Sequence, residues 1–142
     1  MQAHGLIGTP RFTFDGSATY ELWIPAPGVI LQRVSGKADV DVARAIMKEL
    51  QRALDEFGEL AIFDDFTGLL AYTSNARFEL TEWSKSKRPQ IRATHILVAS
   101  KLIAMGVSVA SIAVRGLRSY SERSRFEAAL DAEIAHANSR RP

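Results

Sequence analysis

The sequence predicts a single α/β domain on a mixed β-sheet, with an antiparallel hairpin at its start and about four helices. Length and composition support one domain, because 142 residues with 46% hydrophobic side chains can bury one core of ordinary size. Two apolar runs, residues 19–24 and 29–34, flank a proline-rich connection and predict the hairpin. After residue 39, helical periodicity alternates with short apolar runs, a pattern typical of parallel strands joined by right-handed helical crossovers.

The domain is expected to cover residues 11–137. Residues 1–10 contain glycines and a proline, which break regular structure, so a flexible N-terminal arm is expected there. Residues 138–142 are polar and are expected to form a frayed tail. No low-complexity segment interrupts the sequence between these two ends, which favours a packed domain over disorder.

The first half of the domain is expected to hold three strands and a helix. Residues 11–15 alternate apolar and polar side chains, as a short edge strand does, and residues 19–24 and 29–34 follow as the hairpin. Asp39 is the expected N-cap of a helix, and Gly58 stands where a left-handed C-cap glycine belongs. The apolar stripe of this helix is Val42, Ile46, Met47, Leu50, Ala53, Leu54 and Phe57.

The middle of the chain is expected to form a buried strand, a loop and a second helix. Residues 60–63 are apolar and predict the strand, which ends at a pair of aspartates. A short turn and a second apolar run follow. Thr73 or Ser74 caps the next helix, which runs to about residue 85. Its inward side chains are Ala76, Leu80 and Trp83.

The last third of the chain is expected to hold two strands and two helices. Residues 94–99 predict another buried strand, and Ser100 caps a short helix over residues 101–105. Residues 111–114 predict a last, outer strand. Ser121 then caps a final helix. The inward face of that helix is Phe126, Ala129, Leu130, Ile134 and Ala137.

Charge and composition exclude several classes of function. A net charge of +2, from scattered residues, is too small to predict nucleic-acid binding. The absence of cysteine excludes disulfides, thiolate metal sites and a cysteine nucleophile, and fits a reducing cytosol. The N-terminus lacks a signal-peptide pattern, and Lys101 and Gly106 interrupt the most apolar window. We therefore expect a cytoplasmic protein without a membrane span.

Asp64 and Asp65 are the most conspicuous candidates for chemistry. Adjacent side chains on a continuing strand point to opposite faces of the sheet, so the two carboxylates do not form an acid–base pair. His95 alternates with apolar residues, which favours a hydrogen-bonded core or rim histidine over a base. No ligand spacing supports a metal, and no serine nucleophile elbow, P-loop or dinucleotide motif is present. We expect no enzyme activity, no cofactor and no metal.

The helix that starts at Thr73 and Ser74 offers a different kind of site. Free N–H groups and the positive end of the helix dipole favour an anion there. A phosphoryl group on the N-terminal hydroxyl adds about −1.5 to −2 charges at a point that tolerates them. The surface charge would change while the fold persists, which suits a recognition switch, and Arg77, one turn along, could help to hold the anion.

Four segments of the chain, taken in order, match the pattern of one known family. Residues 29–36 look like a strand that ends in glycine before the first helix. Asp65-Phe66-Thr67-Gly68-Leu69 resembles that family's Asp-x-Ser/Thr-Gly-Val turn, and Thr73-Ser74-Asn75-Ala76 stands where its phosphorylation loop opens the second helix. Residues 94–109 look like its next strand and short helix. Over about residues 29–130 the chain thus resembles the STAS domains (sulfate transporter and anti-sigma-factor antagonist), the family of the sporulation anti-anti-sigma factor and the stressosome proteins.

The resemblance implies a STAS-like mixed sheet with helices packed mainly on one face, and a non-enzymatic role. Members bind a protein partner through the second helix and the loop before it, and in many a kinase partner phosphorylates that loop and releases the complex. Carried over by position, the phosphoacceptor is Ser74, with Thr73 as the neighbouring candidate. The chain departs from the pattern at two positions: Thr73 replaces the acidic residue before the acceptor, and Ala76 replaces the glycine after the pair.

We therefore expect a STAS-like signalling or scaffold module that binds a protein, such as a kinase or an anti-sigma-like regulator, through residues 65–83. Partner-contacting side chains are expected among Asp65, Thr67, Gly68, Asn75, Arg77 and Phe78. Phe78 lies off the inward face of its helix, which makes it a candidate exposed anchor. Homodimerisation through the early edge strands or the second helix stays open.

An alternative is a small-molecule or lipid-binding module of the same fold. In that reading Trp23, Phe63, Tyr72 and Trp83 line a cavity. An enzyme that uses Asp64, Asp65 and His95 is the least favoured class, because the spacing of these residues supports no shared site.

Overall fold

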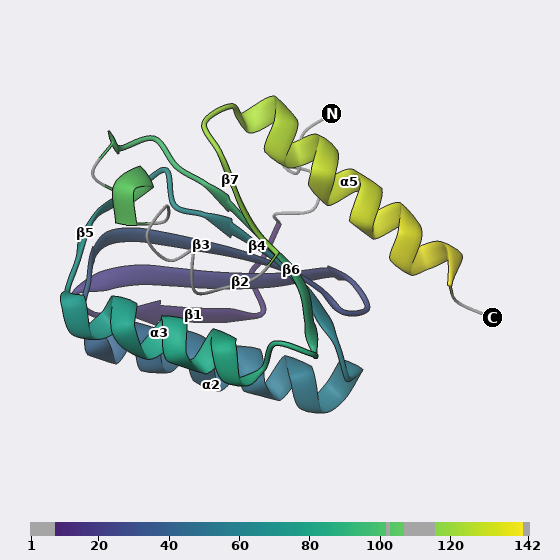
Figure 1. The fold of residues 1–142 in the computed structure, drawn as a ribbon, viewed down its shortest axis with the longest axis horizontal. Coiled ribbons are helices and arrows are strands. Elements are labelled where there is room, and N and C mark those ends of the chain that lie inside the picture. Colours follow the sequence, from purple (N-terminus) through teal and green to yellow (C-terminus); the bar gives the residue numbers. More distant parts are fainter. Residues whose placement is uncertain (1–7, 102, 107–115, 141–142) are drawn as a thin grey trace.

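The computed structural model describes residues 8–101, 103–106 and 116–140 (Figure 1). Residues 1–7 of the expected arm, residues 141–142 of the expected tail and the strand expected over residues 111–114 lie outside the described residues. Within the described part, seven strands form one mixed sheet with helices on both faces.

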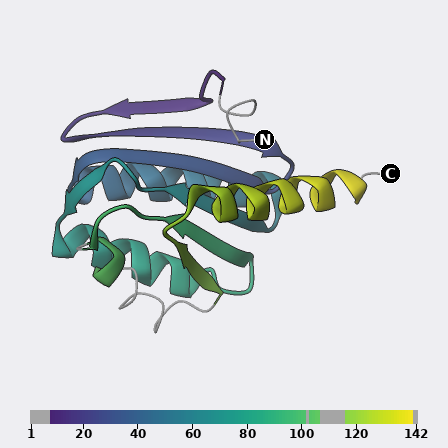
Figure 2. The ribbon, with the colours of Figure 1, turned by 90° about the horizontal axis from the view of Figure 1, so that it is seen from above.

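The sheet begins antiparallel and continues parallel. Its strands are β1 (Phe12–Asp15), β2 (Ala18–Ala26), β3 (Val29–Ala38), β4 (Leu60–Asp65), β5 (Leu69–Tyr72), β6 (Ile91–Leu97) and β7 (Leu117–Tyr120). Strands β1, β2 and β3 are antiparallel neighbours, and every later pairing is parallel. The spatial order is β1-β2-β3-β4-β6-β7, with β5 also paired to β3. Figure 2 shows β1 and β2 at one side of the sheet and β6 and β7 at the other, which confirms the predicted mixed sheet with an antiparallel opening hairpin.

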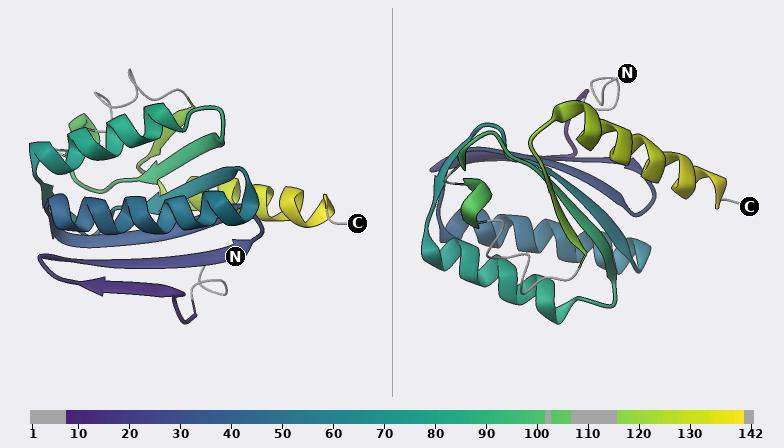
Figure 3. Two further views of the ribbon diagram at one scale, coloured as in Figure 1. Left: turned by 90° about the horizontal axis from the view of Figure 1, so that it is seen from below. Right: turned by 45° about the horizontal axis from the view of Figure 1, so that its top comes forward.

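Three long helices cover the sheet. They are α2 (Val40–Phe57), α3 (Ser74–Ser86) and α5 (Arg123–Ser139). Helices α2 and α3 share one face, as predicted, whereas α5 lies across the opposite face (Figure 3). Residues 101 and 103–106 are also helical, and the hydroxyl of Ser100 accepts a hydrogen bond from the Ile103 N–H at 3.4 Å.

Capping residues that can be recognised in the sequence mark both ends of α2, whereas no side-chain cap marks the start of α5. The Asp39 side chain accepts hydrogen bonds from the N–H groups of Asp41 and Val42, and Gly58 closes the helix with φ of 83°. Both caps confirm the prediction. The expected cap of α5 at Ser121 was wrong: Glu122 precedes the helix, and its side chain makes no capping hydrogen bond.

The sheet divides the core into two clusters, and β4 lies between them. Leu60 and Ile62 point toward α2 and α3, and Ala61 and Phe63 point toward α5. All six residues of β4 are buried, because the strand is central in the sheet and has helices on each face. This arrangement places alternate residues of one strand in two separate environments.

Several strand ends differ from the prediction. Strand β2 continues past Pro25 to Ala26, where the register is irregular, so the missing proline N–H interrupts no regular ladder. Strand β3 extends to Ala38 because its last residues pair with β5, in addition to its pairing with β2 and β4. The sequence did not predict β7, whose four residues carry Arg118 and Ser119 at exposed positions.

Strands β4 and β5 lie end to end along β3, joined by residues 66–68. The N–H of Gly36 on β3 donates to the carbonyl of Gly68 at 2.9 Å, which holds this turn against the sheet. A Cβ at position 68 would lie 2.5 Å from the Ser35 hydroxyl oxygen. A larger residue at position 68 would therefore force the Ser35 hydroxyl to move, because the turn approaches β3 closely.

Candidate functional site

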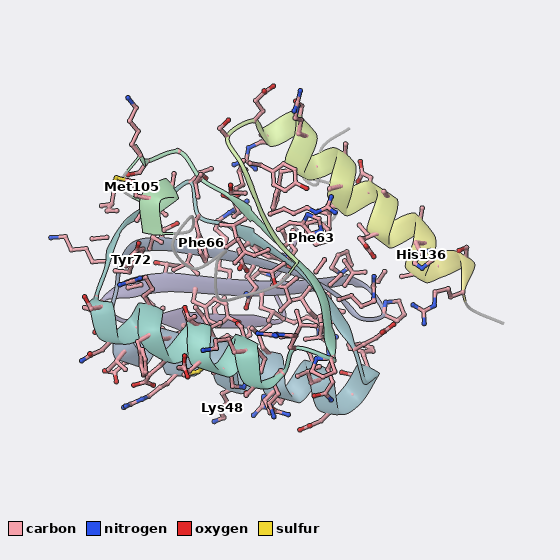
Figure 4. The ribbon with its side chains drawn as sticks, viewed as in Figure 1. Lys48, Phe63, Phe66, Tyr72, Met105 and His136 are labelled. Carbon is pink, nitrogen blue, oxygen red and sulfur yellow. The ribbon has the colours of Figure 1, made fainter. Side chains whose placement is uncertain are left out.

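The carboxyl ends of the parallel strands define the candidate site. Strands β3, β4, β6 and β7 run parallel and end at Ala38, Asp65, Leu97 and Tyr120. Crevices at such an edge are common ligand and interaction sites in open α/β sheets. The turn at residues 66–68 and the start of α3 lie at this edge, together with Tyr72 and Met105 (Figure 4).

Asp65 is a buried carboxylate that holds the turn in place. It is 3% exposed, and its Oδ1 accepts from the N–H of Thr67 at 3.1 Å and from the Thr67 hydroxyl at 2.7 Å. Its Oδ2 lies 3.2 Å from the guanidinium of Arg123 and 3.5 Å from that of Arg33. Burial by itself would raise the pKa of Asp65, but the hydrogen bonds from Thr67 and the two arginine charges outweigh it and lower that pKa.

We expect Asp65→Asn to lower the free energy of unfolding at pH 7 by about 1 to 3 kcal/mol, because it weakens the charged contacts. A carboxyl group whose pKa is lower in the folded state than in the unfolded chain stabilises the fold at a pH above its unfolded-state pKa. That stabilisation is lost as the pH falls through the folded-state pKa. Urea titrations at pH 7 and pH 3 should therefore show a smaller loss at pH 3 than at pH 7. Asp15→Asn, at an exposed position on β1, is the matched control, and an equal loss at both pH values would contradict the assignment.

Asp64 points to the other face of the sheet, as the alternation of a strand predicts. Its Oδ1 accepts from the Gln32 amide at 2.6 Å, and Gln32 in turn accepts from the Tyr20 hydroxyl at 2.6 Å. Burial raises the pKa of Asp64 to about 7, against the hydrogen bond from Gln32, and the neighbouring Asp65 charge adds to the rise. Burial and the Asp64 and Glu49 charges also raise the pKa of Tyr20.

A cavity of about 130 Å³ lies between the sheet and α3, next to Asp64. Most of its wall is apolar and comes from both the strands and the helices, with Val34, Ile46, Leu50, Ile62, Leu69 and Ile96 among its residues. Phe66 lines it from the turn, and Tyr72 from β5 (Figure 4). Gln32 and Asp64 are its buried polar residues, and Arg77 and Thr81 line it from α3.

The aromatic residues expected around a cavity are divided between the two faces. Tyr72 lines the cavity. Trp23 and Phe63 belong to the core under α5, and Trp83 packs against the α2–α3 core without lining the cavity. The alternative interpretation, in which these four residues share one cavity, is wrong, because β2 and β4 direct Trp23 and Phe63 to the core on the α5 face.

The start of α3 presents three polar side chains to solvent. Thr73 is the N-cap, and its hydroxyl accepts from the Ala76 N–H at 3.1 Å. Thr73, Ser74 and Asn75 are exposed, and the first turn contains no acidic residue. An anion at this point would meet the N-terminal end of the helix dipole without acidic repulsion from that turn.

Three large apolar side chains are exposed near the same edge. Leu70 on β5, Phe78 on α3 and Met105 at the end of the short helical segment are 67%, 65% and 67% exposed. Phe78 projects to solvent one turn into α3, while Ala76 of the same helix is buried. Phe78 is therefore an exposed aromatic on a helix whose other side packs against the sheet.

His95 lies on the α5 face, away from Asp64. It is 6% exposed, and its Nδ1 lies 2.8 Å from the Tyr120 hydroxyl. Its ring stacks on Phe63 with centroids 4.3 Å apart. Burial lowers its pKa, and the charge of Arg118 adds to this effect. Among the described residues, no group of three or more potential metal ligands is found.

The structure joins residues that are distant in the sequence, and the sequence analysis missed several of them. Gln32, the partner of Asp64, has one visible signal, since it and Arg33 are the two polar residues within the otherwise apolar run of residues 29–34. Arg123, the partner of Asp65, is 58 residues away, and nothing local connects the two. The predicted partner-contacting residues lie in different surroundings. Asp65 is buried under the turn, and Arg77 lines the cavity. Thr67, Asn75 and Phe78 are exposed.

Comparisons with known proteins identify the fold. No protein-family model matches the chain, and no curated protein sequence matches it. The fold is similar to that of an uncharacterised protein from Shewanella loihica PV-4, described as a DUF3478 family member with a SpoIIAA-like fold. The TM-score is 0.63 at 14% sequence identity, over 82% of this chain and 98% of that chain. The chain therefore has a SpoIIAA-like fold.

Proposed function

We propose that the chain is a non-enzymatic STAS-like module that binds a protein partner through the turn at residues 66–68 and the first two turns of α3. The exposed Phe78 carries this proposal. An aromatic side chain that is 65% exposed on a well-formed helix is typical of the anchors that dominate protein interfaces. Asn75 on the same helix and Thr67 on the turn are exposed polar side chains, of the kind found at the rim of an interface.

The turn at residues 66–68 is suited to recognition because it is held in one geometry. Asp65 fixes Thr67 by two hydrogen bonds and is itself paired with Arg33 and Arg123. Gly68 is fitted closely against β3. A surface that is already ordered loses less conformational entropy on binding, which favours affinity.

The proposal includes phosphorylation of Ser74 as a switch. The Thr73 hydroxyl is engaged in capping the helix, so Ser74, exposed at the first helical position, is the freer acceptor. A phosphoryl group there would gain from the helix dipole and leave α3 intact. The added charge would act on the partner, which we expect to be a cytoplasmic kinase or an anti-sigma-like regulator. A homodimer is a further partner class.

A non-enzymatic role is supported by where the titratable groups lie. Asp64 and Asp65 point to opposite faces of the sheet, and His95 lies on the α5 face with its Nδ1 beside Tyr120. A general acid and a general base must reach the same substrate atoms. In the described part of the chain, these three groups do not converge on one cleft.

Affinity capture from the native host, with mass spectrometry of partners and phosphosites, tests this function. We expect Phe78→Ala to weaken partner binding by about tenfold or more, and Ser74→Asp to weaken it while Ser74→Ala does not. Glu56→Ala is the control, since it truncates an exposed side chain on α2, outside residues 65–83. Partners retained at wild-type levels by both Phe78→Ala and Ser74→Asp would reject the proposed surface.

In the described part of the chain, none of the helices is long and apolar enough to cross a membrane.

A further inference from the structure

The cavity between the sheet and α3 has the size of a small-molecule site. Its volume is about 130 Å³, and apolar protein cavities of about 150 Å³ take up benzene. A single ring or a short branched chain fits this space, whereas a long acyl chain exceeds it. The mostly apolar wall would supply the hydrophobic contacts of such a ligand.

Asp64 gives this cavity one strong hydrogen-bond acceptor. Its side chain is 7% exposed, and its Oδ1 is held by Gln32. Among the ion pairs of the described residues none includes Asp64, whereas Asp65 on the other face has two arginines. A carboxylate in apolar surroundings gains most from a cation that brings its own donors, because charge-assisted hydrogen bonds offset the cost of burial.

We propose that this cavity binds a small primary amine with an aromatic or branched apolar body. The ammonium group would donate to Asp64, and the body would lie between the sheet and α3. Arg77 also lines the cavity from α3, and among the described residues that line it Asp64 is the only carboxylate. The site adjoins the proposed docking surface, because Phe66, Ala76 and Arg77 line the cavity, whereas Phe78 itself projects to solvent.

Amine binding should weaken in mildly acidic solution. The pKa of Asp64 is about 7 because the group is buried, so below pH 7 the carboxyl holds a proton and loses its value as a partner for ammonium. The other titratable or charged groups around the cavity are Tyr20, Asp65 and Tyr72 from the strands, Glu49 from α2 and Arg77 from α3. Tyr20 has a raised pKa and Asp65 a lowered one, so neither changes charge between pH 5.5 and pH 8.

Calorimetric titration of the full chain with benzylamine and with toluene tests the proposal, because toluene has the same ring without a donor. At pH 8 we expect benzylamine to bind about tenfold more tightly than toluene. At pH 5.5 its affinity should fall about tenfold while that of toluene stays the same. Toluene binding as tightly as benzylamine at pH 8, or no benzylamine binding at millimolar concentration, would overturn the proposal.

Three variants locate the binding. Asp64→Asn should reduce the affinity for benzylamine to that for toluene, and Asp15→Asn, an exposed acid on β1, should leave it unchanged. Thr81→Phe fills the cavity from α3 and should abolish binding of both probes, with thermal unfolding confirming that the variant is folded. Wild-type benzylamine affinity in Asp64→Asn would rule the site out, and that result would leave the proposed partner surface at Phe78 untouched.

Discussion

Replacing Asp64 by asparagine should raise the free energy of unfolding at pH 8 by about 2 to 4 kcal/mol. One pKa unit corresponds to about 1.4 kcal/mol. A pKa raised from 3.8 to about 7 therefore means that ionising Asp64 costs the folded state about 4 kcal/mol at high pH. Asparagine is neutral and of similar shape, and its carbonyl can still accept from Gln32, so the variant avoids most of this cost.

The sign of the pH dependence follows from proton counting. Between pH 4 and pH 7 folded Asp64 retains its proton and the unfolded chain does not, so the stability of the wild type falls as the pH rises through this range. At pH 4 the variant and the wild type should differ by less than about 1 kcal/mol. Guanidinium titrations at pH 4, 6 and 8 measure the difference, and a difference that did not grow with pH would contradict the raised pKa.

Phe126→Ala should lower the free energy of unfolding by about 3 to 5 kcal/mol. Phe126 is 1% exposed on the inward face of α5. Its ring meets Phe63 edge-on at a centroid distance of 5.7 Å and Tyr120 at 6.0 Å, contacts that add to the apolar area it buries. Alanine would leave a void between α5 and the sheet that these neighbours cannot fill without moving.

The chain offers a matched control for this experiment. Phe78→Ala is the same substitution at a position that is 65% exposed, so it should change stability by less than about 0.5 kcal/mol. Chemical denaturation of the two variants, followed by tryptophan fluorescence and circular dichroism, compares them directly. If Phe126→Ala were as mild as Phe78→Ala, α5 would not be part of the cooperative core.

The parts of the fold that the sequence predicted are those set by local chemistry. Asp39 and Gly58 mark the two ends of α2 because a cap acts on N–H and carbonyl groups within four residues. The alternation of Asp64 and Asp65 between faces also follows from the strand itself. The order of apolar runs and helical stripes was enough to predict the mixed sheet.

The parts that the sequence did not predict depend on partners far along the chain. Strand β7 is four residues long with Arg118 and Ser119 exposed, and its pairing with β6 makes it a strand. The pairing of Asp65 with Arg123 and the position of Gln32 beside Asp64 arise only when distant strands meet. The sequence therefore did not predict the buried polar contacts of the candidate site, and the role of its exposed residues stays a prediction.

Helix α3 is anchored by few buried side chains. Ala76 is its one buried residue, whereas α2 has seven, and the cavity lies where further packing would otherwise be. Any molecule in that cavity would add its binding free energy to the docking of α3 on the sheet. The same helix carries Phe78 on its outer side. If a ligand in the cavity changes the affinity of this outer side for a partner, thermodynamic linkage requires that the bound partner change the affinity of the cavity for its ligand by the same factor.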